Sequence, residues 1–429
     1  MASEYIDTFY KRTLGDAHTR HSALAGPAST DVCIVGGGLA GLTAALELAR
    51  RGRQVTLLEA CRVGWGASGR NGGSVSPAYS AGAGLIRRRV GQAGYEDLYR
   101  MSIEGVDIIR ENIRALDIVD AREVDGRLRV LRYDNADELR RYCDEQRRFG
   151  RRVRLLERSE VRELLRSDAY FQGIYDPDSF HFHPLNYARA LARECIRLGV
   201  RIHEDTPVRS ASLGGPAKRL ATFGGSVEAQ TVLFATGGYT DTLVPALRRA
   251  MLPIATYIML TEPLGERVRE AIRTDAAIGD TRRAGNYYRV VEGGRISWGS
   301  HITTRIDDPP DLAESLRAEL LSVYPQLAGV KVEVAWSGRM AYARHLMPQI
   351  GCLQPGVWYC TAFGGHGMNT TAIGGRVVAE GICGDSQRYR QFAPFGLDWN
   401  GGPLGTAAVQ LTYWSYQMRD RLRERRSRG

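Results

Sequence analysis

The sequence predicts two kinds of architecture in one chain: a parallel-sheet α/β domain, and an α+β domain built on a mixed or antiparallel sheet. Near the N-terminus, two short apolar segments enclose a glycine-rich turn and an alanine- and leucine-rich segment, which is the strand–helix–strand order of a parallel sheet. Between residues 250 and 340, shorter segments separated by a glycine turn indicate antiparallel strands. The 429 residues suffice for both domains, because single hydrophobic cores stop growing at about 250–300 residues.

The α/β unit occupies residues 31–59 and contains a GxGxxG turn. We expect a strand over 31–35, a helix over 42–51 and a second strand over 54–58. Gly36 permits the tight turn out of the first strand, Gly38 lets the backbone approach a pyrophosphate, and Gly41 lets the helix and strand pack closely.

The residues beside that turn predict a dinucleotide ligand. Leu39 and Ala40 stand at the helix N-terminus, which offers free N–H groups and a partial positive charge to phosphates. Glu59 ends the second strand, where a carboxylate accepts hydrogen bonds from ribose hydroxyls, and Ala60 follows it. The alternative, a glycine-rich turn without a ligand, does not account for an acid at this spacing. The motif alone does not choose between FAD and NAD.

A second glycine-rich loop follows over residues 64–73, where five of the ten residues are glycine. Such a loop can bring many backbone N–H groups to an anionic or heteroaromatic ligand. The alternative is a flexible linker, but linkers are usually Gly/Ser repeats, and this segment holds Trp65, Arg70 and Asn71.

Further segments extend both predicted sheets. An apolar strand over 231–235 ends at Thr236 and Gly237, and another over 357–360 leads into a glycine loop and a helix over 369–382. In the second region we expect a hairpin of strands 286–291 and 295–300, a helix over 311–324 and a strand over 331–336.

At this point the chain resembles the D-amino-acid oxidase-like, or glycine/sarcosine oxidase, family of FAD-dependent oxidoreductases. Within it the chain looks most similar to the γ-glutamylputrescine oxidase and pipecolate oxidase types. The matching segments are 35–41, 66–73, 181–186, 235–238, 347–349 and 364–367, in the family's order.

The resemblance implies a Rossmann-like FAD-binding domain with an inserted substrate domain. The expected FAD-binding domain is non-contiguous and comprises 28–90, 184–242 and 345–385; the substrate domain comprises 91–183 and 243–344. Residues 1–27 form an N-terminal extension, and 386–429 a C-terminal segment with an amphipathic helix. The expected FAD contacts are Gly36, Gly38, Leu39, Ala40, Gly41, Glu59, Ala60, Gly66, Ala67, Ser68, Arg70, Asn71, Gly72, Val208, Thr236, Gly237, Gly364, Gly365, His366, Gly367, Met368 and Asn369.

Flavin oxidation of an amine requires a site that orients the substrate C–H bond and excludes water, rather than a catalytic triad. We expect His366 and Tyr288 to be catalytic, although a loop-filling histidine and a core tyrosine are the alternatives. The expected substrate contacts are Arg70, Tyr288, Trp298, Arg339 and Asn369. Arg70 could instead form a surface ion pair, and Trp298 could belong to the core. His181 and His183 precede a predicted helix, where we favour a structural role.

Three departures from the family pattern bear on function. Sarcosine-oxidase relatives place a substrate-binding lysine where this chain has Asn369. A second family lysine, which is thought to assist the reaction with oxygen, falls near Ser297. Some relatives tether FAD through a cysteine, but this chain has none between Cys195 and Cys352, so we expect non-covalent FAD.

The predicted activity is oxidation of a C–N bond in a small, γ-glutamylputrescine-like amine to an imine or aldehyde, with electrons passed to oxygen. The alternatives are an L-pipecolate or cyclic imino-acid oxidase, a quinone-linked dehydrogenase at a membrane surface, and a flavoprotein without turnover. The membrane alternative rests on residues 404–424, an amphipathic helical pattern followed by arginines. A helix docked on the protein body is the simpler interpretation.

Composition argues against several other functions. The net charge is +10, but all except three of the 58 basic residues are arginines, spread along the chain among acids rather than clustered in a nucleic-acid-binding module. We expect no metal site, because His181 and His183 lack accompanying ligands. The N-terminus lacks the apolar core of a secretory signal, and no apolar run reaches about 20 residues, so we expect a cytoplasmic protein.

Overall fold

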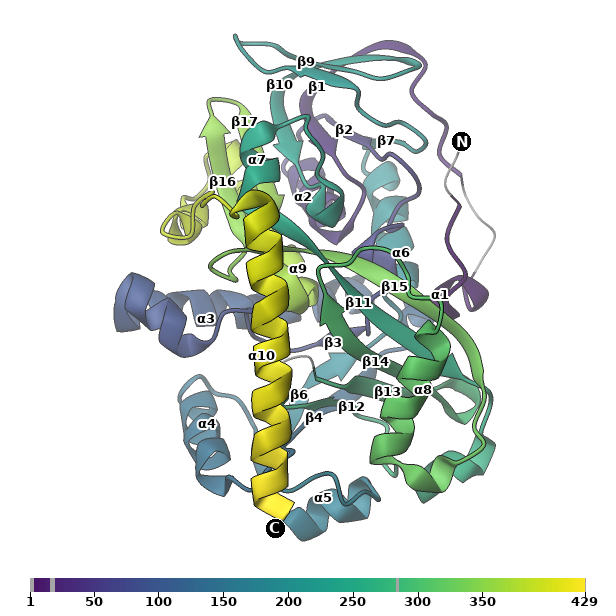
Figure 1. Cartoon of the computed structure of the whole chain (residues 1–429). Helices are drawn as coiled ribbons and strands as arrows, with labels where there is room; N and C mark the ends of the chain where they lie inside the picture. The colour runs from purple at the N-terminus through teal and green to yellow at the C-terminus, as the bar shows by residue number, and fades with distance from the viewer. Residues whose placement is uncertain (1–3, 16–19, 283–284, 429) are drawn as a thin grey trace.

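The computed structural model describes residues 4–15, 20–282 and 285–428. Two large sheets lie one beyond the other along the molecule, and a long C-terminal helix begins near the first sheet and runs down one side of the second (Figure 1). This arrangement confirms the predicted combination of a parallel α/β sheet with a mixed sheet.

The first sheet has eight strands among the described residues, with β16-β17-β10-β1-β2-β7 as its main path and β8 and β9 extending from β10. The pairs of β1 with β2 and β10, β2 with β7, and β10 with β17 are parallel. The bounds are β1 (Gly26–Val35), β2 (Val55–Leu58), β7 (Arg201–His203), β8 (Ser210–Ser212), β9 (Lys218–Ala221), β10 (Gly225–Phe234), β16 (Gln349–Gln354) and β17 (Val357–Thr361).

Three helices pack on this sheet: α2 (Leu39–Arg50), α6 (Pro184–Arg197) and α9 (Gly367–Cys383). Helices α2 and α9 cross closely because Gly375 has no side chain: a Cβ there would lie 2.7 Å from Cβ of Thr43. Apolar side chains from these helices and from β1 and β2 form the largest core cluster, which includes Leu42, Leu46 and Val377. Burying these side chains fixes the carboxyl ends of the parallel strands at one edge, where ligands bind in open α/β sheets.

The second sheet has nine strands, counted over the described residues, and is mixed: β12 pairs parallel with β4, and the other pairs are antiparallel. Its order is β15-β11-β14-β13-β12-β4-β6-β3, with β5 beside β6. The bounds are β3 (Ser74–Val75), β4 (Val124–Val130), β5 (Arg154–Leu156), β6 (Gly173–His181), β11 (Met251–Thr261), β12 (Ala277–Asp280), β13 (Tyr287–Val291), β14 (Arg295–Thr303) and β15 (Val332–Ala343).

The predicted hairpin is present, since β13 and β14 pair in register around Gly293 and Gly294, both of which have positive φ. The helix predicted over 311–324 is α8 (Leu312–Val323), which packs on β15, β11 and β14. The other α-helices are α1 (Phe9–Arg12), α3 (Ala83–Ala115), α4 (Ala136–Arg148), α5 (Arg158–Leu164) and α7 (Pro245–Ala250). Short 3₁₀ helices cover 67–69, 119–121, 237–239, 265–270, 292–294, 325–327, 364–366 and 388–392.

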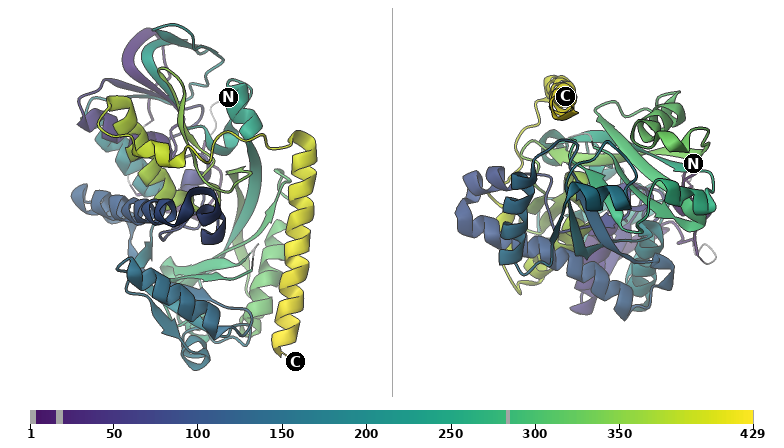
Figure 2. Two further views of the ribbon diagram at one scale, coloured as in Figure 1. Left: turned by 90° about the vertical axis from the view of Figure 1, so that its left-hand side faces the viewer. Right: turned by 90° about the horizontal axis from the view of Figure 1, so that it is seen from below.

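The C-terminal helix α10 (Gly402–Arg428) lies along the outside of the molecule (Figure 2). Its inner face is fastened by polar contacts: Oε1 of Gln410 accepts hydrogen bonds from Thr303 and Thr304, and Glu424 forms ion pairs with Arg132 and Arg282. The helix is therefore docked on the protein body, as the simpler interpretation of its sequence predicts.

Candidate active site

A single elongated cavity of about 1300 Å³ is lined by residues from both sheets, by the two glycine-rich segments and by α10. It is large enough for a dinucleotide and a small substrate together, since single-ligand pockets usually enclose about 300–1,000 Å³. Of the expected FAD contacts, all except Gly41 and Asn369 lie in its wall.

The GxGxxG turn forms one end of this cavity. Gly36 has φ of 112°, and a Cβ there would lie 2.6 Å from the carbonyl oxygen of Ala235, so a larger residue does not fit. A Cβ on Gly38 would lie 2.9 Å from Oγ of Ser68, which accepts a hydrogen bond from the amide of Leu39. The N-terminus of α2 thus faces the cavity across a surface of bare backbone, which suits a pyrophosphate.

Gly41 has the packing role that the spacing predicts. A Cβ at this position would lie 2.0 Å from the carbonyl oxygen of Gly36, so the absence of a side chain lets α2 lie against β1. Gly41 therefore supports the GxGxxG turn from the side away from the cavity and is not part of the cavity wall.

Glu59 lies at the end of β2 with both carboxylate oxygens engaged by backbone. One accepts a 2.6 Å hydrogen bond from the amide of Gly37, and the other a 2.9 Å bond from the amide of Cys61. Burial raises the pKa of Glu59, and these two hydrogen bonds oppose that rise. Each oxygen keeps a second lone pair, so the carboxylate can still accept bonds from ribose hydroxyls.

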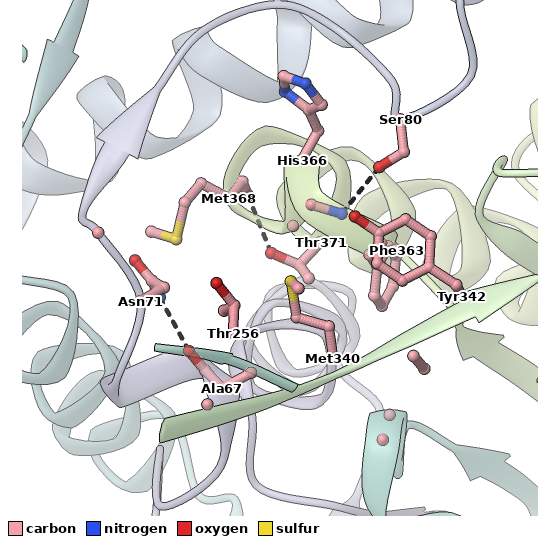
Figure 3. A pocket seen from close by; sticks show the side chains of 18 of the residues that line it. Ala67, Asn71, Ser80, Thr256, Met340, Tyr342, Phe363, His366, Met368 and Thr371 are labelled. Carbon is pink, nitrogen blue, oxygen red and sulfur yellow. Dashed lines mark hydrogen bonds between the residues drawn. The ribbon is translucent and has the colours of Figure 1, made fainter. Parts of the chain in front are cut away.

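The second glycine-rich loop is held in shape by its own side chains. The amide nitrogen of Asn71 donates to the carbonyls of Ala67 and Ser68, both at 3.0 Å, and its oxygen accepts from the amide of Gly73 at 2.7 Å. The loop is therefore a defined structure rather than a flexible linker, and Ala67 and Asn71 face the cavity (Figure 3).

Arg70 and Arg339 lie near each other around Tyr239. The guanidinium of Arg70 lies 4.0 Å from the ring centroid of Trp65, and its Nε donates to the Trp65 carbonyl. Burial lowers the pKa of Arg70, and its Nη2 has no hydrogen-bond partner within the described part of the chain. The guanidinium of Arg339 lies 5.2 Å from the Tyr239 ring. Both arginines line the cavity.

His366 lies in the cavity wall at the start of α9, and its imidazole points away from Thr256 and Met340 (Figure 3). The loop before it is fixed by a 2.8 Å hydrogen bond from the amide of Gly365 to Oγ of Ser80. Burial, with smaller contributions from Arg127 and Arg129, lowers the pKa of His366 to about 4. Its imidazole is therefore neutral near pH 7 and can accept a hydrogen bond from an amine.

The structure places Tyr288 and Trp298 in a stacked core cluster behind the sheet, although Tyr288 also borders the cavity. The Tyr288 hydroxyl donates to Tyr170 and shares a 2.8 Å hydrogen bond with Tyr324, in the core behind the sheet. Trp298 is fully buried there and stacks on Tyr288 with ring centroids 4.3 Å apart. The side chains of consecutive strand residues point to opposite faces, so the ring of Tyr287 lies on the face toward the second glycine-rich loop, and both tyrosines contribute to the cavity wall.

Tyr287 is the residue that sequence reasoning missed by one position. A Cβ on Gly72 would lie 2.9 Å from the Tyr287 ring, and one on Gly299 would lie 2.1 Å from it. Because neither glycine has a side chain, the Tyr287 ring fits between the loop and β14. The Tyr287 hydroxyl forms a 3.1 Å hydrogen bond with Thr256. The sequence offered one signal for this. Neighbouring strand residues point to opposite faces, so a Tyr288 with a buried hydroxyl partner leaves Tyr287 on the other face of the strand.

Asn369 is the second correction. Its amide nitrogen donates to the carbonyls of Ala78 and Ser102, at 3.1 and 3.2 Å, and it is buried outside the cavity wall. It therefore ties α9 to α3 and to the segment before it, and does not face a ligand. The neighbouring Met368 does line the cavity, as do Ser297, Tyr342 and Phe363.

His181 and His183 have the structural roles that we favoured. Nδ1 of His183 accepts the amide of Asn186 and caps α6, while the ring of His181 bonds to the Asp275 carbonyl and to Arg289. Burial, and then the charge of Arg289, lowers the pKa of both histidines to about 3. No group of three potential metal ligands occurs within the described ranges.

These residues fit FAD. Bare backbone faces the place of the pyrophosphate, a carboxylate lies at the place of the ribose, and the start of α9 offers N–H groups at the far end of the cavity. A helix N-terminus stabilises negative charge, which suits the pyrimidine end of a reduced flavin.

Comparison with known proteins agrees with this geometry. The family model described as FAD dependent oxidoreductase matches residues 31–381. The chain is 33% identical over 401 residues to γ-glutamylputrescine oxidoreductase of Escherichia coli, covering 91% of this chain and 93% of the relative. It is also 33% identical to the probable oxidoreductase OrdL of Haemophilus influenzae, over 84% of this chain and 85% of that one.

Among solved structures, L-proline dehydrogenase from P. horikoshii superposes with a TM-score of 0.72 at 19% identity, covering 87% of this chain and all of the other. Glycine oxidase from Geobacillus kaustophilus gives 0.72 at 21% identity, over 86% of this chain and 99% of that structure. These two similarities establish the fold. Together with the family match, they show that the protein is an FAD-dependent oxidoreductase of the DAO family, whose members act on C–N bonds of amines and amino acids.

Proposed function

We propose that this enzyme oxidises the terminal C–N bond of a small amine with a remote acidic group, as in γ-glutamylputrescine, and passes the electrons to oxygen. The amine loses two electrons and two protons to give an imine, which water converts to an aldehyde and ammonia. Oxygen takes up the same electrons and protons as hydrogen peroxide. The 33% identity to γ-glutamylputrescine oxidoreductase supports this substrate class.

The observation that carries the proposal is an uncharged stretch of the cavity wall beside the start of α9. Thr256, Met340, Tyr342 and Met368 lie on this stretch (Figure 3), and Asn369, at the position where sarcosine-oxidase relatives place a lysine, is turned away from the cavity. An α-carboxylate beside the reacting carbon would need a desolvated cation to pair with it. A methylene chain ending in an amine needs only apolar and neutral polar contacts, which this wall provides.

The bound FAD supplies the acceptor for the hydride. The chain's own residues bind and orient the amine: aromatic and thioether side chains exclude water from the methylene carbons, and the neutral imidazole of His366 can accept an N–H of the amine. The Tyr287 and Thr256 hydroxyls, already bonded to each other, provide a further polar contact.

The test is a steady-state peroxide assay with γ-glutamylputrescine, putrescine, L-pipecolate, proline and sarcosine, with an aldehyde trap on the products. We expect the highest kcat/KM for γ-glutamylputrescine and an aldehyde product. A higher kcat/KM for L-pipecolate would favour the imino-acid alternative. In that case Arg70→Ala or Arg339→Ala should abolish binding of the α-carboxylate, whereas neither change should matter for an amine without one.

A second candidate, a quinone-linked dehydrogenase at a membrane surface, is favoured by the outer face of α10. Five large apolar side chains there are 48–81% exposed and share one side of the helix, namely Leu404, Leu411, Trp414, Met418 and Leu422. Arg421 and Arg425 are exposed near its end, while Glu424 faces inward. Such a face suits an anionic membrane. Among the described helices, none is both long and apolar enough to cross a membrane.

The acceptor and the location can be tested together. Rapid reoxidation of the reduced enzyme in air, without flotation on anionic liposomes, would support the oxidase. Slow reoxidation that a quinone accelerates, together with flotation, would support the dehydrogenase. Ser297 lines the cavity where relatives place an oxygen-activating lysine. The rate at which the reduced enzyme reoxidises in air therefore distinguishes the oxidase from the dehydrogenase.

A further inference from the structure

Beyond the uncharged wall, the cavity extends along the second sheet to a pair of arginines on β4. Across the sheet, Tyr287 of β13 pairs with Gly279 of β12, and Gly279 pairs with Arg129 of β4. Directly paired residues share a face, and so do residues two apart, so Arg127 lies on the same face as Tyr287. Both arginines are in the cavity wall.

Gly279 leaves the floor of this extension open. A Cβ at Gly279 would lie 3.3 Å from Nη2 of Arg127, so the guanidinium rests over the bare backbone of β12. Strand β12 separates β4 from β13, so the Cα of Arg129 lies two strand spacings, about 10 Å, from that of Tyr287, and the Cα of Arg127, two residues along β4, lies at about 12 Å. A ligand that extended from His366 along the sheet would meet this guanidinium at its far end.

Arg127 has no direct ion-pair partner among the residues that the structure describes. Nor does it make a hydrogen bond with any of these described residues. Asp176, its register partner on β6, is instead held by Arg151 through bonds of 2.7 and 2.8 Å, and by Ser179. Arg129 is partly neutralised by Glu138 at 3.9 Å and lies 4.9 Å from the Tyr142 ring.

Arg127 is partly buried, and partial burial of an unpaired cation has a cost. Burial lowers the pKa of Arg127, yet a guanidinium stays charged at all physiological pH values. A buried charge is normally paired, and arginine forms its strongest contacts with planar carboxylates. Arg127 and His366 line the same cavity, and the charge of Arg127 contributes to the lowered pKa of His366.

We propose that Arg127, flanked by Arg129, binds the carboxylate at the far end of the amine substrate. The inference rests on the proposed function and specifies it: the preferred substrates are primary amines joined by a short apolar chain to a terminal carboxylate or amino-acid group. The arginine pair selects them over simple diamines and places the amine beside His366. Arg70 and Arg339, around Tyr239, are not part of this subsite.

The test compares FAD-loaded wild type with Arg127→Met, which keeps much of the side-chain volume, and Arg127→Lys, which keeps the charge. The substrates are γ-glutamylputrescine and N-acetylputrescine, which has the same reactive amine and an amide but no carboxylate. For Arg127→Met we expect kcat/KM on γ-glutamylputrescine to fall by about 30-fold or more, mainly through KM, because a buried carboxylate loses its partner. The value for N-acetylputrescine should stay within about twofold, and Arg127→Lys should restore part of the loss.

Arg154→Met is the matched control, because Arg154 is exposed on β5 and pairs with Glu160, away from the cavity. It should change neither substrate. Equal losses on both substrates in Arg127→Met would show a structural role and overturn the proposal, as would unchanged kinetics on γ-glutamylputrescine.

A binding measurement separates this inference from the proposed function. γ-Glutamylethylamide carries the same carboxylate but no oxidisable terminal amine, and its binding can be followed by perturbation of the flavin spectrum. We expect a dissociation constant that rises about 30-fold or more in Arg127→Met. If no amine is oxidised while this difference remains, the proposed function fails and the subsite stands. If amines are oxidised and both proteins bind the probe equally, the subsite fails and the proposed function stands.

Discussion

At the scale of single residues, Glu59 connects the motif to the cofactor most directly. Glu59→Ala removes a carboxylate that can accept ribose hydroxyls and that already orders the amides of Gly37 and Cys61. Loss of a charge-assisted hydrogen bond costs about 1.5–3 kcal/mol, which corresponds to roughly a 10- to 150-fold weaker affinity for FAD. Titration of the apoprotein with FAD measures this change. Glu228→Ala, on an exposed position of β10, should leave the affinity unchanged.

Tyr287 and Tyr288 form a natural pair of test positions because they are neighbours on opposite faces of β13. Tyr288→Phe leaves the hydroxyls of Tyr170 and Tyr324 without their shared partner, so we expect a loss of about 1–3 kcal/mol in unfolding free energy with kcat/KM retained. Tyr287→Phe should do the reverse and lower kcat/KM with little change in stability. Denaturant unfolding and amine kinetics on both variants measure the two effects. Loss of activity in Tyr288→Phe at full stability would contradict the assignment.

Some residues of the site were predictable from the sequence, and others were not. Glycine positions such as Gly36 and Gly38 were predictable, because a backbone that must approach a ligand excludes other residues. The orientations of Tyr288 and Asn369 were not, because they depend on a one-residue strand register and on partners at Tyr170 and Ala78 that lie far away in the chain. Arg127 gave no local signal, since its role depends on Gly279 across the sheet.

At the scale of elements, periodicity predicted most of what forms. The strand at 31–35 is part of β1 and the helix at 42–51 is α2, which begins three residues earlier than the pattern indicated because Gly38 acts as its N-cap. The helix at 404–424 is α10, but its docking was not predictable. The contacts that hold it join Glu424 to Arg132 and Arg282, 292 and 142 residues away.

The docking of α10 provides a prediction at this scale. Glu424 is buried and receives hydrogen bonds from Arg282 at 2.5 and 2.8 Å and from Arg132 at 3.3 Å. Breaking such a buried pair costs about 3–5 kcal/mol. We expect Glu424→Gln to release the helix, so that limited trypsin digestion cleaves α10 many times faster than in the wild type. Glu314→Gln, which removes an exposed pair with Arg317 on α8, is the control and should leave the cleavage rate unchanged.

The same ion pairs give a defined pH dependence. Burial alone would raise the pKa of Glu424, but the Arg282 hydrogen bonds and the Arg132 charge lower it overall. A lowered folded-state pKa contributes stability above the unfolded value of about 4.3, and that contribution is lost as pH falls through the folded value. The difference in protease resistance between wild type and Glu424→Gln, measured with an acid-active protease, should therefore shrink toward zero as the pH falls below about 4.3. Asp280 stays protonated in that range, because burial raises its pKa to about 6.

At the scale of the whole molecule, the cavity is made by bringing together segments that are distant in the sequence. The cofactor end comes from residues near 36–40, 59–72 and 236–237, and the opposite wall from β4, β12, β13 and β15. Local patterns predicted each segment but not their assembly. That expectation came from the family resemblance, and the match over residues 31–381 confirms the family. The domain boundaries at 90, 184, 242 and 345 stay a prediction.

The attachment of FAD is a property of this assembled cavity. Of the described residues in its wall, Cys61 is the only cysteine, and it follows Glu59 at the ribose end, away from the place of the isoalloxazine. We therefore expect non-covalent FAD. Acid precipitation of the yellow protein should release intact FAD into the supernatant, and flavin retained on the washed pellet would contradict this expectation.

The central claim is that a bound amine with a remote carboxylate loses its hydride in this cavity, and anaerobic mixing tests it most directly. Stopped-flow absorbance of the FAD-loaded enzyme records flavin reduction without any dependence on the electron acceptor. We predict complete bleaching by γ-glutamylputrescine, at a rate that saturates at lower concentration than with putrescine, and little bleaching by L-pipecolate or sarcosine. Bleaching by L-pipecolate in preference to the amines, or by none of these compounds, would contradict the account.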